Sequence, residues 1–360
     1  MTVGRASPGV DSPAEIYNNR PGPRPAPADL SEGPAALREM LPITPHDLAV
    51  TLDWEYDWDF VRLIEVEAAV LGLRTLVVSP ADVAARLEDL RSGCLDFRVL
   101  LDRASISSPD FMAFQTAALE RGRDVIDPVD RVRWASDKAT MHLEFIAHGV
   151  NTPYTLILPP AESGWSLPLG PAELVPLGSP FVIKPANTTG GCLGVVEDAS
   201  RIEDALTARQ AYPSDKYLLQ EKIIPEERDG KRFWFRGFFI LGDVHCTWWD
   251  PKTHVYTELA DDDAGRYDLQ PLPAVVRTVA AISGLRFFST EIVRDARGQL
   301  IAVDYVNETC DMRVQSKHAD GVPDTVVRKI AGRIASYAGE KRPCGPAMSP
   351  TDPEPEGRAS

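Results

Sequence analysis

The chain has 360 residues, of which 44% are hydrophobic and 25% charged, a balance typical of globular proteins. Its formal net charge of −15, from 38 Lys and Arg against 53 Asp and Glu, argues against nucleic acid or an anionic membrane as a partner, because both require a basic surface. We find no run of about 18 apolar residues, no apolar signal-peptide core and no CxxC pair among the five cysteines, so we expect a cytoplasmic protein without a transmembrane span, disulfides or a zinc site.

The two ends of the chain differ in composition from the rest. Residues 1–43 are rich in Pro, Gly, Ser and Ala and show no apolar period, which predicts a disordered tail. Residues 339–360 have a similar composition and are also predicted to be a disordered tail.

Strands and helices alternate over residues 44–130. The predicted strands cover 47–53, 74–80, 96–102 and 123–128, and the predicted helices cover 57–73, 81–93 and 109–122. Strands that alternate with helices of ten or more residues indicate βαβ units and a parallel sheet. We therefore expect an N-terminal α/β domain over 44–130.

Antiparallel strand pairs enter the pattern after residue 137. Helices are predicted at 138–150, 200–211, 273–285 and 324–338, and strands at 154–159, 178–185, 216–224, 231–242, 243–250, 286–295 and 299–308. Two of the long strands meet at Gly242-Asp243 in the manner of a hairpin. This half is predicted to be α+β, with a solvated polar loop around the three aspartates at 261–263.

A lysine ends the apolar strand FVIKP at residues 181–185. Side chains alternate along a strand, so Lys184 faces away from Phe181 and Ile183. The following ANTTGG (186–191) offers backbone N–H groups that can converge on an anion, which predicts a phosphate-covering loop. Neither GxxxxGK[ST] nor GxGxxG is present, and by itself such a lysine is more often part of an ordinary strand-to-turn transition.

Four stretches, in this order and at these distances, resemble the ATP-grasp superfamily, which includes glutathione synthetase and D-alanine:D-alanine ligase. They cover 136–158, 180–196, 217–242 and 289–308. The resemblance extends over about 130–338. It implies a two-subdomain ATP-grasp fold, with subdomains at 131–215 and 216–338, preceded by the α/β domain that such enzymes place first.

The resemblance assigns nucleotide-binding roles to several residues. Lys138 and Lys184 match the two lysines that hold the α and β phosphates, and Arg236 matches an arginine that points at the triphosphate. The loop over the γ phosphate corresponds to Thr188, Thr189, Gly190 and Gly191, and the adenine hinge to Glu221 and Lys222. Ordinary alternatives are a first-turn helix residue for Lys138, a charged edge-strand pair for 221–222 and an exposed strand residue for Arg236.

The magnesium ligands implied by the resemblance are Glu291, Asp304 and Asn307. The family pattern has a carboxylate two residues before the asparagine, but Tyr305 occupies that position and Asp304 lies three residues before Asn307. A β-bulge would restore a common face for the two side chains, and Glu308 is an alternative ligand. A relative that binds nucleotide without turnover would show a similar departure from the pattern.

The loop after Asn307 approaches the acyl intermediate in these ligases. Arg313, Ser316, Lys317 and His318 are therefore candidates for binding a substrate carboxylate or stabilising an oxyanion, although a solvated polar loop explains them equally well. Elsewhere, His142 and His148 are six residues apart on one predicted helix and do not share a face as ligands.

The resemblance implies an ATP-dependent carboxylate-amine ligase that works through an acylphosphate and uses ATP with two Mg2+ (or Mn2+) ions. The expected partners are a small carboxylate and an amine, either of them an amino acid or a peptide, and a homodimer is compatible because many relatives dimerise. The alternatives are a small-molecule kinase of the same fold and a non-catalytic ATP-binding protein. A biotin-carboxylase-like enzyme would use bicarbonate, and we find no biotin-carrier segment.

Overall fold

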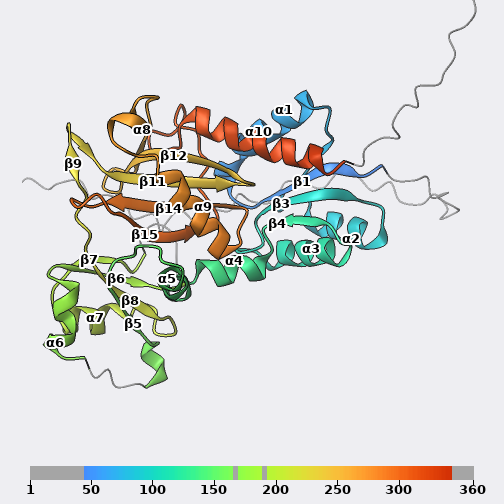
Figure 1. Ribbon diagram of the computed structural model, residues 1–360. Helices are drawn as coiled ribbons and strands as arrows, with labels where there is room; N and C mark the ends of the chain where they lie inside the picture. The colour runs from blue at the N-terminus through green and yellow to red at the C-terminus, as the bar shows by residue number, and fades with distance from the viewer. Residues whose placement is uncertain (1–43, 165–168, 189–192, 343–360) are drawn as a thin grey trace, which may run out of the picture. The chain divides into compact units, whose positions relative to one another are not determined.

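Residues 44–164, 169–188 and 193–342 are described by the computed structural model shown in Figure 1. The predicted tail 1–43 lies outside the described residues, as does 343–360 of the predicted C-terminal tail. The described residues belong to one unit in their backbone contacts, so the domain boundaries predicted at residues 130 and 215 stay predictions.

The first sheet is parallel and has four strands in the order β2-β1-β3-β4, which confirms the predicted α/β pattern (Figure 1). Its strands are β1 (His46–Leu52), β2 (Thr75–Val78), β3 (Phe97–Arg103) and β4 (Asp124–Ile126), and its helices are α1 (Trp58–Val70), α2 (Val83–Ser92) and α3 (Pro109–Glu120). The chain passes from β1 to β2 on one side of β1 and then crosses to β3 on its other side. Ligands of open α/β sheets bind beyond the carboxyl ends of the strands at such a switch point.

The second sheet is antiparallel, in the order β5-β8-β6-β7. Its strands are β5 (Thr155–Leu158), β6 (Phe181–Pro185), β7 (Val196–Ala199) and β8 (Tyr217–Glu221). Its neighbours in the chain are the helices α4 (Val129–Ser136), α5 (Lys138–Ala147), α6 (Pro171–Leu174) and α7 (Ile202–Ala208). The sequence analysis did not predict α4, α6 or β7, which are at most eight residues long.

The third sheet is antiparallel, in the order β13-β12-β11-β14-β15. Its strands are β11 (Trp234–Ile240), β12 (Asp243–Asp250), β13 (Val255–Glu258), β14 (Phe287–Arg294) and β15 (Leu300–Asn307), preceded by the short pair β9 (Glu227–Arg228) and β10 (Lys231–Arg232). The remaining helices are α8 (Asp263–Arg266), α9 (Leu272–Ser283) and α10 (Asp324–Glu340). Helix α9 packs on β11, β12 and β15.

One hydrophobic core joins the parallel sheet to the C-terminal part of the chain. Helix α10 packs against α1 and β1. Helices α1 and α10 run side by side in Figure 1. Phe238 and Ile240 of β11 belong to the same buried cluster as Val50 of β1. The first and last parts of the described chain therefore stabilise each other.

Two details differ from the sequence-based expectations. The hairpin turn consists of Leu241 and Gly242, with φ of 48° and 100°, because Ile240 pairs with Asp243; the predicted Gly242-Asp243 turn was one residue out of place. Asp263 is not solvated: only 4% of it is exposed, and it accepts a hydrogen bond of 2.8 Å from Trp248 Nε1.

Among the described residues, no helix is both long enough and apolar enough to cross a membrane. Three cysteines in this part of the chain, Cys94, Cys246 and Cys310, are free thiols, and the other two lie outside it.

Candidate active site

A cleft of about 770 Å³ is lined by residues of both antiparallel sheets. Of the thirteen residues that the resemblance assigns to the nucleotide, to magnesium or, for Arg313, to the substrate carboxylate, ten line it: Lys138, Lys184, Thr188, Glu221, Lys222, Arg236, Glu291, Asp304, Asn307 and Arg313. The other three, Thr189, Gly190 and Gly191, lie outside the described residues. Residues from sequence positions as far apart as 138 and 313 thus meet in one space whose volume suits a small-molecule ligand.

Two lysines enter the cleft from α5 and β6. Asp137 caps α5 by accepting hydrogen bonds of 3.0 Å from the backbone of Ala139 and Thr140, so the helix begins at Lys138. Lys138 Nζ lies 3.7 Å from Asp304 Oδ1. In β6 the neighbours of Lys184 are buried, as the alternation predicted, and Lys184 Nζ donates a hydrogen bond of 2.8 Å to the Val303 carbonyl.

Arg236 and Glu291 face each other on paired strands. They are directly opposite in the β11–β14 register and form an ion pair, and Trp234 Nε1 donates a second hydrogen bond of 3.0 Å to Glu291. Burial raises the pKa of Glu291, although the charge of Arg236 opposes this effect. This ion pair therefore places one cation and one carboxylate side by side in the wall of the cleft.

A β-bulge brings Asp304 and Asn307 together. Ser289 pairs with Asn307 and Glu291 pairs with Asp304, so β15 advances three residues while β14 advances two. Asn307 Nδ2 donates a hydrogen bond of 2.9 Å to Asp304 Oδ2. The two side chains therefore share a face despite their spacing, as the sequence analysis required for a ligand role of Asp304.

Electrostatics keep Asp304 ionised. Burial alone would raise its pKa, but the charges of Lys138, Lys184 and Arg236 together lower the pKa of Asp304 to about 2. Asp304 is therefore a carboxylate over the whole neutral range and a hard oxygen donor for a cation.

Tyr305 is buried behind the bulge and was not predicted to matter. Its ring packs edge-on against Phe145, with the ring centres 5.0 Å apart. Its hydroxyl accepts a hydrogen bond of 2.8 Å from Gln220 Nε2 and lies 2.7 Å from His142 Nδ1. Burial, together with the charge of Lys184, lowers the pKa of His142 to about 4, so this histidine is neutral at pH 7. No sequence pattern links these residues, because they come from α5, β8 and β15.

The far end of the cleft is formed by the end of β8. Glu221 exchanges hydrogen bonds with the Tyr154 backbone, accepting from its N–H at 3.2 Å and donating to its carbonyl at 2.8 Å. Lys222 Nζ donates to Asp198 at 2.6 Å. Val182 and Ile223 also line this part, so an apolar wall lies beside the backbone groups.

The loop after Asn307 contributes one candidate to the cleft. Arg313 lines it and is held between Asp311 and Asp320, with bonds of 2.6 and 2.9 Å. The other three candidates do not line it. Ser316 bonds Asp324 at the start of α10, Lys317 pairs with Asp59 at 2.6 Å, and the ring of His318 lies 5.7 Å from that of Tyr56.

No protein-family model matches this chain, and no curated protein matches it in sequence. Solved structures do match in their fold. An ATP-grasp RimK domain protein from Sphaerobacter thermophilus aligns with a TM-score of 0.53 and 19% identity, over 81% of this chain and 98% of its own. The D-alanine–D-alanine ligase from Bacillus anthracis, solved with ATP, aligns with a TM-score of 0.56 and 10% identity, over 82% and 96%.

This chain has the ATP-grasp fold. A third similar structure, the ATP-grasp ligase PsnB with precursor peptide PsnA2 and AMPPNP, covers 83% of this chain and 99% of its own, with a TM-score of 0.55 and 12% identity. The fold expected from the four sequence stretches is confirmed.

The oxygen donors of the ATP-grasp cleft suit magnesium. Glu291, Asp304 and Asn307 provide two carboxylates and one amide, the hard ligands that Mg2+ prefers when it also binds phosphates. In the part of the chain that the structure describes, no group of three or more His, Cys, Asp or Glu side chains could hold a metal ion by itself.

Proposed function

We propose that this protein is an ATP-dependent carboxylate-amine ligase that forms an amide bond and releases ADP and phosphate. The observation that carries the proposal is the meeting of Lys138, Lys184 and Arg236 with Glu291, Asp304 and Asn307 in one cleft of an ATP-grasp fold. Three cations suit a polyphosphate, and the oxygen donors opposite suit its magnesium.

We assign the nucleotide to a position that extends along the whole cleft. Lys138 and Lys184 bind the α and β phosphates, and the apolar end beside Glu221 and Lys222 receives the adenine. We assign the cover over the γ phosphate to the loop that starts at Thr188, whose described part is held by Asp215 through hydrogen bonds of 2.9 and 3.1 Å. That cover would exclude water from the reacting group.

Glu291, Asp304 and Asn307 are assigned to two Mg2+ (or Mn2+) ions. Bound metal supplies positive charge that neutralises the phosphate oxygens and holds them in place. Asp304 stays ionised and so keeps its donor oxygens through the neutral range, since the neighbouring cations lower its pKa to about 2. Asn307 orients Asp304 through their hydrogen bond.

The proposed reaction has two steps. An oxygen of the substrate carboxylate bonds the γ phosphorus while the bond from that phosphorus to ADP breaks, which gives an acylphosphate. The amine nitrogen then bonds the acyl carbon, phosphate leaves, and the nitrogen loses its proton to give the amide. Both steps move negative charge between oxygens, so the task of the protein is positioning and charge neutralisation.

We propose that Arg236 and Arg313 neutralise the negative charge that moves between oxygens in these two steps. Arg236 forms an ion pair with Glu291 and also acts on the charge of Asp304, and Arg313 is paired with both Asp311 and Asp320. Arg236 lies directly opposite the proposed metal ligand Glu291 in the strand register, and we therefore assign the transferring phosphoryl group to it. Arg313 is assigned to orienting the substrate carboxylate through hydrogen bonds.

The substrates are proposed to be a small carboxylate and an amine, with an amino acid or peptide as one of them. Support comes from similar folds whose structures were solved as a D-alanine–D-alanine ligase and as a ligase with a precursor peptide. Such substrates carry both reacting groups.

The test is a mass-spectrometric screen with Mg-ATP, pooled carboxylic acids and pooled amines, with ADP followed in parallel. A product lighter than acid plus amine by one water, formed together with ADP, supports the ligase. A phosphorylated product would instead establish a kinase, and nucleotide binding without ADP would favour the non-catalytic alternative. Lys184→Ala should abolish turnover, whereas Lys329→Ala, at an exposed position on α10, should not.

A further inference from the structure

The segment after β15 directs two charged side chains into the cleft. Every second residue of it, Cys310, Met312 and Val314, is buried in one hydrophobic core cluster. The residues between them, Asp311 and Arg313, line the cleft instead. The packing of the core therefore fixes the side on which both charges lie.

A tight turn brings Asp320 to the same wall of the cleft. The Gly321 N–H donates a hydrogen bond of 2.7 Å to the His318 carbonyl, and a Cβ atom at Gly321 would lie only 2.6 Å from the Arg313 carbonyl oxygen. Glycine permits this close approach of two backbone segments. Asp311, Arg313 and Asp320, called the charged cluster below, thus meet in a closed turn.

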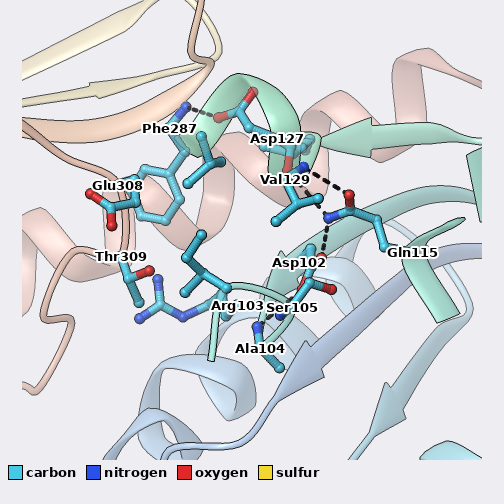
Figure 2. Close-up of a pocket in the computed structure, with 13 residues that line it drawn as sticks. Asp102, Arg103, Ala104, Ser105, Gln115, Asp127, Val129, Phe287, Glu308 and Thr309 are labelled. Atoms are coloured by element: carbon cyan, nitrogen blue, oxygen red, sulfur yellow. Dashed lines mark hydrogen bonds between the residues drawn. The ribbon is translucent and has the colours of Figure 1, made fainter. Parts of the chain in front are cut away.

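The charged cluster is anchored to the first sheet. Arg103, at the end of β3, pairs with Asp57 and donates a hydrogen bond of 2.8 Å to the carbonyl of Cys310, the residue just before the cluster. Figure 2 shows Arg103, Glu308 and Thr309 around a small cavity at the carboxyl ends of β3 and β4. The cluster therefore adjoins the end of the parallel sheet at which ligands of such folds bind.

The charged cluster has one negative charge in excess. Arg313 Nη2 donates to Asp311 Oδ2 at 2.6 Å and to Asp320 Oδ2 at 2.9 Å, so both oxygens approach the same nitrogen. Arg313 Nε also donates to Asp311 at 2.9 Å, and Nη1 donates to Asp320 at 3.2 Å. Two carboxylates share one guanidinium, which neutralises only one of them.

Both aspartates are open to the cleft, since the side chains of Asp311 and Asp320 are 29% and 44% exposed. Each also accepts a backbone N–H, Asp311 from Arg313 at 2.9 Å and Asp320 from its own residue. These neutral donors do not remove the excess charge. The hydrogen bonds from Arg313 lower the pKa of Asp320, which is therefore ionised at pH 7.

Arg313 keeps one hydrogen-bond donor for a ligand. A guanidinium has five N–H groups. Four of them are directed at the two aspartates, so one N–H of Nη1 has no acceptor among the residues that the structure describes.

Tyr256 lies between the charged cluster and Arg236. Its carbonyl accepts a hydrogen bond of 2.8 Å from Gln315 Nε2, and its ring belongs to the same core cluster as Met312. Burial raises the pKa of Tyr256 to about 12, and the charges of Arg236 and Asp311 act on it with opposite signs. Tyr256 lines the cleft and is only 4% exposed, and its hydroxyl has no hydrogen-bond partner in the described part of the chain. Buried hydroxyls are nearly always bonded, so this one indicates a ligand group.

An α-amino acid matches these groups better than a simple carboxylic acid does. Its ammonium group brings three N–H donors and the positive charge that the cluster lacks. Its carboxylate can accept hydrogen bonds from Arg313 Nη1 and from the hydroxyl of Tyr256. A ligand with a carboxylate alone would meet two carboxylates and one guanidinium, and the excess negative charge would repel it.

We propose that the charged cluster binds an α-amino acid, with Asp311 and Asp320 as the charge partners of its ammonium group. The inference rests on the proposed function and narrows its carboxylate substrate from any small acid to an α-amino acid. Arg313 and Tyr256 hold the carboxylate on the side that faces Arg236, where the phosphoryl group is transferred.

Saturation-transfer NMR with glycine, acetate and methylammonium tests the cluster without turnover. Glycine carries both charged groups, whereas acetate and methylammonium carry one each. The full chain is measured without and with Mg-AMPPNP. We expect glycine to bind at least tenfold more tightly than either of the other two probes.

Asp320→Asn separates charge recognition from a structural role. The change keeps the side-chain shape and removes the excess charge, so glycine should bind at least tenfold more weakly while acetate binds equally or more tightly. A structural role of Asp320 alone would weaken the binding of both probes. Tyr256→Phe should weaken both severalfold, and Asp268→Asn, at an exposed position, is the matched control that should leave both unchanged.

Three results would overturn the proposal: no glycine binding, acetate or methylammonium binding as tight as that of glycine, and equal glycine affinity in Asp320→Asn and the unmodified protein. Urea unfolding of each variant establishes that the fold is retained. Titration with AMPPNP is scored separately. ADP-coupled amide formation without glycine binding would refute the amino-acid site and leave the ligase, whereas Asp320-dependent glycine binding without nucleotide binding would refute the ligase and leave the site.

Discussion

Asn307 donates a hydrogen bond of 2.9 Å to Asp304 across a β-bulge, so two side chains three residues apart reach the same cleft wall. Without the bulge, residues three apart on a strand face opposite sides. The bulge places Asp304 opposite Glu291, the other proposed metal carboxylate. The unusual spacing in the sequence is therefore compatible with a complete set of oxygen ligands.

Asp304→Asn should weaken the magnesium dependence of turnover. The amide keeps the shape of the side chain but loses its charge, so we expect the Mg2+ concentration for half-maximal ADP formation to rise about tenfold or more. Asp268→Asn is a suitable control because Asp268 is exposed and its φ of 54° is one that asparagine tolerates. An unchanged Mg2+ requirement in Asp304→Asn would remove Asp304 from the site.

Tyr305→Phe should destabilise the folded protein at the β-bulge of β15. The change removes the acceptor of the 2.8 Å hydrogen bond from Gln220 and the hydroxyl that lies 2.7 Å from His142. We expect the free energy of unfolding to fall by about 1–3 kcal/mol, the usual cost of leaving a buried polar group unpaired. Urea denaturation measures this, with Tyr154→Phe, at a position that is 44% exposed, as control. Equal losses in the two variants would mean that the network adds no stability.

The fold, and the convergence of distant residues on one cleft, could be predicted from the sequence. Alternation of strands and helices predicted the parallel sheet, and the order of four motifs placed Lys138, Lys184 and Arg236 in one cleft. These features depend on local period and on motif order, both of which are visible in one dimension.

Other features depend on contacts that no local pattern encodes. The bulged strand β15 carries Tyr305, which is buried against Phe145 of α5, a helix more than 150 residues away in sequence. The sequence predicted a solvated loop at Asp263, but Asp263 accepts a hydrogen bond from Trp248 Nε1.

His142 should make stability depend on pH. Its pKa is about 4 in the folded protein, against 6.5 for an unperturbed histidine, so between these values the unfolded chain binds a proton that the folded chain does not. The free energy of unfolding therefore falls as pH drops from 6.5 to 4, by about 3 kcal/mol from this residue.

His142→Gln should remove that contribution and give a shallower decline of stability over the same pH window. His148→Gln, at an exposed position just after the same helix, serves as the matched control and should decline as steeply as the unmodified protein. Urea denaturation at several pH values measures all three proteins. Parallel curves for His142→Gln and His148→Gln would show that His142 does not titrate in this window.

Gly237 allows α9 to pack closely on the sheet that carries Arg236. A Cβ atom at Gly237 would lie only 2.5 Å from Val276 Cγ2, well inside contact distance. Gly237→Ala should therefore cost about 1–3 kcal/mol of unfolding free energy and lower turnover, because β11 or α9 must shift. Gly265→Ala, where a Cβ would meet nothing within 4 Å, should have little effect.

Adding Val276→Ala to Gly237→Ala tests this mechanism directly. The second change removes the methyl group that clashes, so stability and turnover should recover relative to Gly237→Ala alone, even though Val276→Ala by itself removes buried apolar volume. A double variant whose loss equals the sum of the two single losses would show that the clash is not the cause. Recovery of turnover along with stability would link the packing of α9 to the position of Arg236, the neighbour of Gly237 on β11.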